Sequence, residues 1–94
     1  MPRITMPPAP ASGRIASRED VGRIIRYMRM QAGLTVDEAA MAIGVAKATL
    51  LRVEQGKGGL QFDKVLKILD GLGVALITLP ANQGTDRVMA WPTN

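Results

Sequence analysis

The sequence contains no cysteine and no histidine, and its aromatic residues are one Trp, one Tyr and one Phe. These absences exclude disulfides, thiolate nucleophiles and the common Cys/His zinc sites, and they remove the usual general base of enzymes. No apolar run approaches the ~20 residues that span a membrane, and residues 1–17 lack the apolar segment of a signal peptide. We therefore expect a cytoplasmic protein with no metal, no cofactor and no membrane partner.

Basic residues exceed acidic ones by four, but the excess lies at one end of the chain. Of the 12 Lys and Arg residues, Arg3, Arg14 and Arg18 fall within residues 1–18, which hold none of the eight acidic residues. The rest of the chain is therefore close to neutral. A nucleic-acid-binding surface would have to come from cations arranged on one side, because there is no large overall excess.

Composition divides the chain into three parts. Residues 1–17 are rich in Pro and small residues, and we expect a flexible arm there, because such a segment buries too little apolar surface to offset its ordering entropy. The alternative is an arginine arm that reaches DNA, as in homeodomains. Residues 18–80 carry periodic apolar patterns and are expected to form one folded domain. The polar residues 81–94 are expected to form a flexible tail.

Two capping boxes mark the starts of the first two helices. Ser17 with Asp20, and Thr35 with Glu38, place a hydroxyl three residues before a carboxylate, the arrangement that satisfies the free N–H groups of a helix start. Glycine follows each of these two segments and predicts where each helix ends. The predicted helices cover approximately residues 18–32, 36–43, 46–55 and 61–72.

Helical spacing also predicts which side chains face the core. In the third helix, Leu50 and Val53 form the apolar side. The expected core face of the fourth helix consists of Phe62, Val65, Leu66 and Leu69. The inward residues predicted for the first two helices are Val21, Ile25, Met28, Ala32, Ala39, Ala40 and Ile43.

A β-branched, apolar segment precedes Pro80 and predicts a short strand. Its residues are Val74, Ala75, Leu76, Ile77, Thr78 and Leu79. A lone strand leaves its backbone groups unpaired, so we expect it to pair with the same strand of a second subunit about a two-fold axis. A helix extension or a buried loop is the alternative.

Residues 34–56 have the pattern of a helix-turn-helix. Gly44 gives the turn its backbone freedom, Ala40 lets the two helices approach, and Leu50 packs between them. With the upstream residues Val21-Gly22 and the later ones to position 72, the pattern resembles the phage-repressor and Cro family. That resemblance implies an all-α, four- to five-helix, lambda-repressor-like fold. It also implies a structural ion pair between Arg29 and Glu54.

The same resemblance makes the third helix the recognition helix in the DNA major groove. The residues it places at the DNA are Thr35, Ala46, Lys47, Ala48, Thr49, Leu51, Arg52 and Lys57. The sequence departs from the family here. Val36 stands where Gln is frequent, and Ala46, Ala48 and Leu51 stand where polar residues are usual. Base contacts then depend on few side chains, which predicts modest sequence specificity or readout through DNA shape.

A narrower resemblance begins at the Gly-Lys-Gly-Gly loop of residues 56–59. This loop, the fourth helix and the apolar segment after it are similar to the HipB-type antitoxins. The resemblance implies a dimeric repressor of a toxin–antitoxin operon that binds operator DNA and partners a HipA-like serine/threonine kinase toxin. Some of these proteins carry a Trp on a C-terminal tail that docks on the toxin, and Trp91 is the matching residue.

The sequence thus predicts a sequence-specific DNA-binding repressor, acting as a homodimer and as the antitoxin of a HipBA-like operon. Two alternatives stay open: a standalone transcriptional regulator, and a protein-interaction module that has lost DNA binding. No enzymatic activity is expected, because Asp37, Asp63 and Asp70 are scattered and no nucleophile–base pair is visible.

Overall fold

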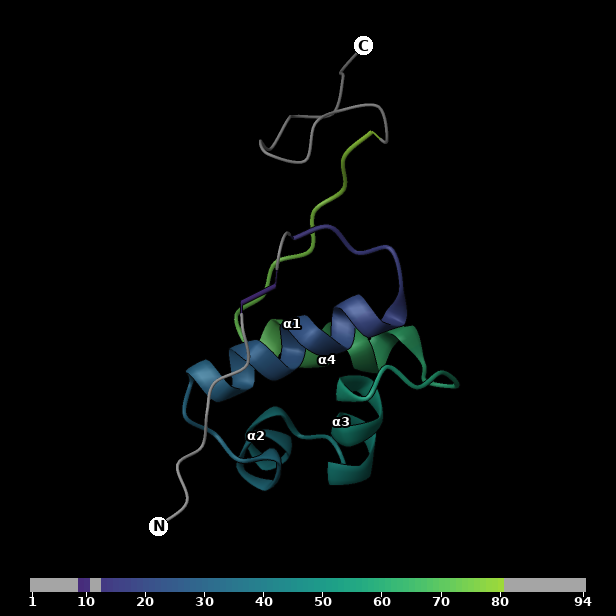
Figure 1. The fold of residues 1–94 in the computed structure, drawn as a ribbon. Coiled ribbons are helices and arrows are strands. Elements are labelled where there is room, and N and C mark those ends of the chain that lie inside the picture. Colours follow the sequence, from purple (N-terminus) through teal and green to yellow (C-terminus); the bar gives the residue numbers. More distant parts are fainter. Residues whose placement is uncertain (1–8, 11–12, 81–94) are drawn as a thin grey trace.

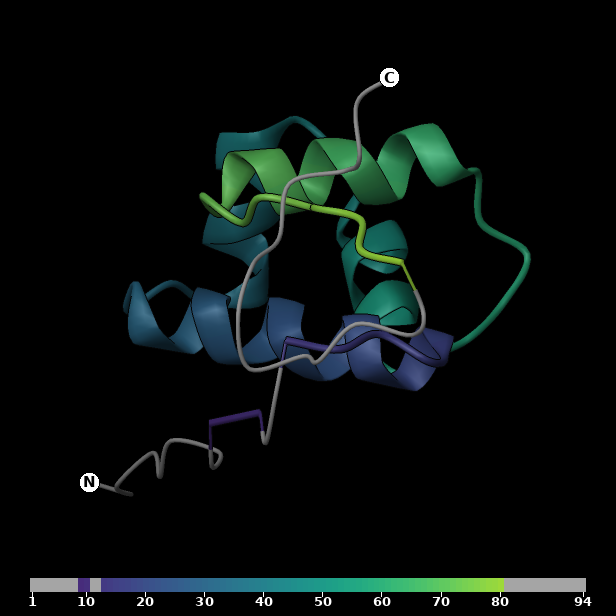
Figure 2. The same cartoon turned by 90° about the horizontal axis from the view of Figure 1, so that it is seen from above.

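A computed structural model describes residues 9–10 and 13–80. This part of the chain contains four helices and no strand: α1 (Arg18–Gln31), α2 (Val36–Ile43), α3 (Lys47–Glu54) and α4 (Phe62–Gly71). Helices α2 and α3 lie on one side of α1 and α4, whereas residues 13–17 and 74–80 lie on the other (Figure 1). Viewed from above, α1 and α4 run along opposite edges of the domain (Figure 2). The prediction of an all-α fold is confirmed, and none of the described helices is long and apolar enough to cross a membrane.

Both predicted capping boxes are present. The Ser17 hydroxyl accepts a hydrogen bond from the backbone N–H of Asp20, whose carboxylate accepts one from Ser17 in return. At the start of α2 the backbone N–H of Glu38 donates to Thr35 Oγ1 at 3.1 Å, and Glu38 Oε1 accepts from the N–H of Thr35 at 2.9 Å. The helices therefore begin where the sequence predicts, because side chains replace the missing partners of the first turn.

The core is aliphatic and receives side chains from all four helices. Ile25, Leu50 and Ile68 are completely buried. Around them lie the buried side chains of Ala39, Ala40, Val53 and Leu69. The inward positions predicted for α3 are confirmed, as are those of Ile25, Ala39 and Ala40.

The predicted core face of α4 is partly wrong. Phe62 is 66% exposed and Leu66 is 39% exposed, whereas Ile68, which the prediction left out, is completely buried. The apolar residues of α4 form one broad stripe that runs from Ile68 to Leu66, so spacing alone does not decide which edge of the stripe turns inward. Packing against α2 selects the side that carries Ile68 and Leu69.

Residues 74–80 have no regular secondary structure. The alternative of a helix extension is wrong, because α4 ends at its C-cap Leu72 and Gly73 follows with φ of 76°. The predicted strand is not present within this one chain. A strand needs a neighbouring strand to pair with, and no residue of the described part of the chain is assigned to a strand. The pairing of residues 74–79 across a dimer therefore stays a prediction. Trp91, the predicted toxin contact, lies outside the described residues.

At Gly22 the backbone of α1 lies close to that of α3. A Cβ atom built at Gly22 would lie 2.5 Å from the carbonyl oxygen of Val53 and 2.7 Å from that of Glu54. Both atoms belong to the backbone and have little room to move. We therefore expect Gly22→Ala to lower the free energy of unfolding by roughly 2–3 kcal/mol, measured by urea denaturation. Gly13→Ala is the control, since nothing lies within 4 Å of the Cβ added there. Equal stability of the two variants would contradict this packing.

The carboxylates of Glu38 and Asp20, which cap α2 and α1, make the stability of the fold depend on pH. The backbone N–H of Thr35 lowers the pKa of Glu38 below its ordinary value of 4.5, and that of Ala16 lowers the pKa of Asp20. A carboxyl whose folded pKa is depressed stabilises the fold above its unfolded pKa, and this contribution is lost as the pH falls through the folded pKa. We expect the thermal midpoint of Glu38→Gln, which keeps an acceptor oxygen, to vary less between pH 5 and pH 3 than that of the wild type. Identical slopes would contradict the assignment.

Candidate nucleic-acid interface

The corner between α2 and α3 is built from a left-handed glycine and a small buried side chain. Gly44 closes α2 with φ of 88°, a conformation that residues other than glycine rarely adopt. The backbone N–H groups of Gly44 and Val45 both donate to the carbonyl of Ala40, at 2.9 and 3.0 Å. Ala40 is buried against Leu50 in the core, so the two helices meet at short range. This is the geometry of a helix-turn-helix.

A nearly buried ion pair connects α1 to the end of α3. Arg29 Nε donates to Glu54 Oε2 at 2.6 Å and Arg29 Nη2 donates to Glu54 Oε1 at 2.9 Å. The Arg29 side chain is 11% exposed and that of Glu54 is 6% exposed. A third N–H, on Nη1, donates to the carbonyl of Leu34 at 2.8 Å. One guanidinium therefore joins α1, the loop before α2, and α3.

The outer face of α3 is open to solvent. Ala46, Lys47, Ala48 and Arg52 are exposed, while Thr49 and Leu51 are half-buried. Of the predicted DNA-contacting residues outside α3, Thr35 is exposed but its hydroxyl already accepts the capping hydrogen bond, and Lys57 is exposed. The structure thus brings most of these positions to one surface that consists of α3 and the turns on either side of it.

Two of the polar side chains on this surface are engaged inside the chain. Lys47 Nζ lies 3.2 Å from Asp37 Oδ1, an ion pair between α3 and the first turn of α2. Arg52 Nη2 donates to the carbonyl of Gly58 at 2.6 Å. Sequence reasoning missed both contacts. The Asp37–Lys47 pair joins residues ten positions apart, on different helices. The Arg52 contact ends on a backbone carbonyl, and the side-chain sequence gives no indication of which carbonyl accepts a hydrogen bond.

The described residues contain no cluster of three or more His, Cys, Asp or Glu that would hold a metal ion. The side chains on the α3 surface are instead hydrogen-bond donors and methyl groups. Such groups suit phosphate oxygens, base edges and thymine methyls.

Comparison with known proteins agrees with this geometry. Residues 13–79 match the family described as helix-turn-helix domain. The chain is 35% identical over 63 residues to the uncharacterized HTH-type transcriptional regulator y4mF of Sinorhizobium fredii (strain NBRC 101917 / NGR234), covering 67% of this chain and 83% of that protein. It also superposes on the HipB–O4 20mer complex with a TM-score of 0.66 and 26% identity, covering 73% of this chain and 97% of that chain. For the HipA–HipB–O2–O3 complex the TM-score is 0.66 and the identity 25%, with the same coverage.

The chain therefore belongs to the helix-turn-helix domain family, and it has the fold of a helix-turn-helix transcriptional regulator of the HipB type. In helix-turn-helix proteins generally, the second helix of the motif lies in the major groove, and α3 occupies that position here.

Asp37 is expected to reduce DNA affinity, because it neutralises Lys47 and places a negative charge beside the surface that would meet phosphates. We expect Asp37→Asn to tighten DNA binding about fivefold at low salt, which corresponds to about 1 kcal/mol. The gain should shrink as salt rises, because both side chains are exposed. Fluorescence anisotropy with labelled duplex DNA measures both effects. Asp63→Asn, on the exposed first turn of α4, is the control. Weaker binding by Asp37→Asn would contradict this interpretation.

Proposed function

We propose that this protein is a sequence-specific DNA-binding repressor that acts as a homodimer and inserts α3 into the major groove. The observation that carries the proposal is the exposed outer face of α3, held in place by the Gly44 turn and the Arg29–Glu54 pair. Lys47 contacts a base edge, Thr49 contacts a thymine methyl or a phosphate, and Ala48 and Leu51 make apolar contacts. With so few donors, much of the affinity comes from phosphates and DNA shape.

The dimer doubles this limited set of contacts. On the side away from α2 and α3 (Figure 1), an apolar groove of about 880 Å³ runs between α1, α4 and residues 74–80. Phe62, Leu76 and Ile77 line this groove and are exposed. A second copy that pairs its residues 74–79 with those of the first would cover these side chains and complete the hydrogen bonds of both segments. Both α3 helices then remain free for DNA.

We further propose that this repressor is the antitoxin of a toxin–antitoxin operon. This role is supported by the likeness to HipB, which is found in the HipA–HipB–O2–O3 complex and of which this chain covers 97%. The toxin partner would be a HipA-like kinase, and Trp91 would contact it. The relative y4mF, whose name is that of a transcriptional regulator alone, favours a standalone regulator as the second candidate. Co-purification with a HipA-like kinase distinguishes the two, and Trp91→Ala should weaken that association while leaving DNA affinity unchanged.

Lys47→Ala tests the contact between α3 and DNA. The variant should lose about 1–3 kcal/mol of binding free energy and should change the preferred base at one position of each half-site. Binding-site selection from a random duplex library measures preference, and anisotropy measures affinity. Lys64→Ala, which removes an exposed lysine from α4, is the control and should retain the wild-type preference. Absence of DNA binding by the wild type at low salt would refute the repressor and favour an interaction module.

Ile77→Pro tests the dimer. Proline removes a backbone donor from the paired segment and should convert the protein to a monomer that binds DNA weakly. Light scattering gives the mass, and circular dichroism verifies that the four helices remain. Ile77→Val keeps both the donor and the β-branched side chain and should remain dimeric. A proline variant that stays a dimer would contradict the shared ribbon.

A further inference from the structure

The loop that follows α3 is rich in glycine and yet has two arginines fixed to it. Gly56 and Gly59 adopt positive φ angles of 71° and 82°. Arg18 Nε, from the start of α1, donates to the carbonyl of Gly56 at 2.8 Å. Arg52 Nη2, from α3, donates to the carbonyl of Gly58 at 2.6 Å. A segment with three glycines in four residues would otherwise sample many conformations, and these two hydrogen bonds restrict it from both sides.

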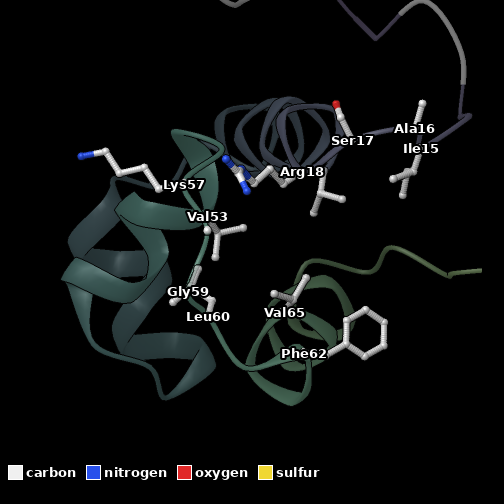
Figure 3. A pocket seen from close by; sticks show the side chains of 12 residues that line it. Ile15, Ala16, Ser17, Arg18, Val53, Lys57, Gly59, Leu60, Phe62 and Val65 are labelled. Carbon is white, nitrogen blue, oxygen red and sulfur yellow. The ribbon is translucent and has the colours of Figure 1, made fainter.

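These contacts gather positive charge at one end of α3. Arg18, Arg52 and Lys57 are all exposed. Figure 3 shows Arg18 reaching from α1 to the loop beside Val53, while the Lys57 side chain extends outward. Lys57 makes no ion pair or side-chain hydrogen bond with the described part of the chain, and the carboxylate nearest to Arg18 Nε is that of Glu19, at 3.8 Å.

The guanidinium groups of Arg18 and Arg52 each have N–H donors that the loop carbonyls do not use. A guanidinium carries five N–H groups, and the contacts to the loop carbonyls use one of them in Arg18 and one in Arg52. The remaining donors belong to planar forks whose geometry matches phosphate oxygens. An arginine tied to a backbone carbonyl is also less free to follow a base edge, and it presents its other donors in a fixed direction.

We propose that Arg18 and Arg52 clamp this loop and, together with Lys57, form a contact site for the DNA phosphate backbone. In this site Arg52 does not contact bases, and Arg18, which sequence reasoning left out of the DNA surface, both holds the loop and donates to phosphate oxygens. Lys47 and Thr49 then remain as the polar side chains of α3 that face the bases. The inference rests on the proposed function, because the ligand is the phosphate of double-stranded DNA.

The first test compares Arg52→Ala and Arg18→Ala with the wild type. Each variant should bind roughly tenfold more weakly to every duplex tested, with the preferred bases unchanged. The slope of log affinity against log salt should become less steep by ~0.9 for each phosphate that the variant no longer neutralises. Arg26→Ala is the matched control, since it removes one exposed cation from the middle of α1 and should leave the slope unchanged. A change of preferred base in Arg52→Ala would overturn the assignment.

The second test changes the position of Arg18 without changing any charge. A Cβ atom added at Gly58 would lie 2.9 Å from Arg18 Nη1, the flexible end of that side chain, so Gly58→Ala should displace the guanidinium at little cost to folding. We expect this variant to melt like the wild type and to lose affinity as Arg18→Ala does. Gly13→Ala, with nothing near its added Cβ, should bind normally. Wild-type affinity in Gly58→Ala would refute the clamp.

DNA binding by the wild type distinguishes failure of the proposed function from failure of the clamp. If the wild-type protein binds no DNA at any salt concentration, the proposed function is refuted before any variant is compared. If the wild type binds and the clamp variants bind equally well, the clamp is refuted and the repressor stands.

Discussion

The guanidinium of Arg29 holds α3 in place against α1 and the loop before α2. It makes two hydrogen bonds to Glu54 at the end of α3 and one to the carbonyl of Leu34 just before α2. A buried pair of this kind contributes more to geometry than to stability, because desolvation offsets much of the attraction. Gly22 completes the arrangement from the same helix, since its missing side chain lets α1 approach the last carbonyls of α3. These contacts hold α3 against α1 and against the loop before α2.

The surface that this scaffold presents has few polar groups free for bases. Asp37 engages Lys47, and the carbonyl of Gly58 engages Arg52. Alanine and leucine occupy other outward positions of α3 and offer only methyl groups. In the proposed complex, DNA competes with these internal partners for the cations, which lowers the affinity of one subunit and makes binding sensitive to salt. On this account, pairing two subunits through the opposite, apolar side restores the affinity that one subunit lacks.

Local chemistry explains which features the sequence predicted. Capping boxes and turn glycines act over three or four residues, so Ser17, Thr35 and Gly44 revealed the helix limits directly. The inward side of α4 was harder to predict, because its apolar stripe is broad and contact with α2 selects the edge that carries Ile68. The contact of Arg18 with Gly56 joins residues 38 apart through a backbone carbonyl. Every residue has a backbone carbonyl, so the sequence does not indicate which carbonyl accepts a hydrogen bond from Arg18.

Hydroxyl-radical footprinting would show whether two copies of α3 lie on one duplex. The DNA would be a duplex that the wild-type protein selects from a random-sequence library. A dimer with one recognition helix per half-site should protect two patches of sugar–phosphate backbone on one face of the duplex, about 34 Å or one helical turn apart. A single protected patch, or uniform protection along the duplex, would contradict the account.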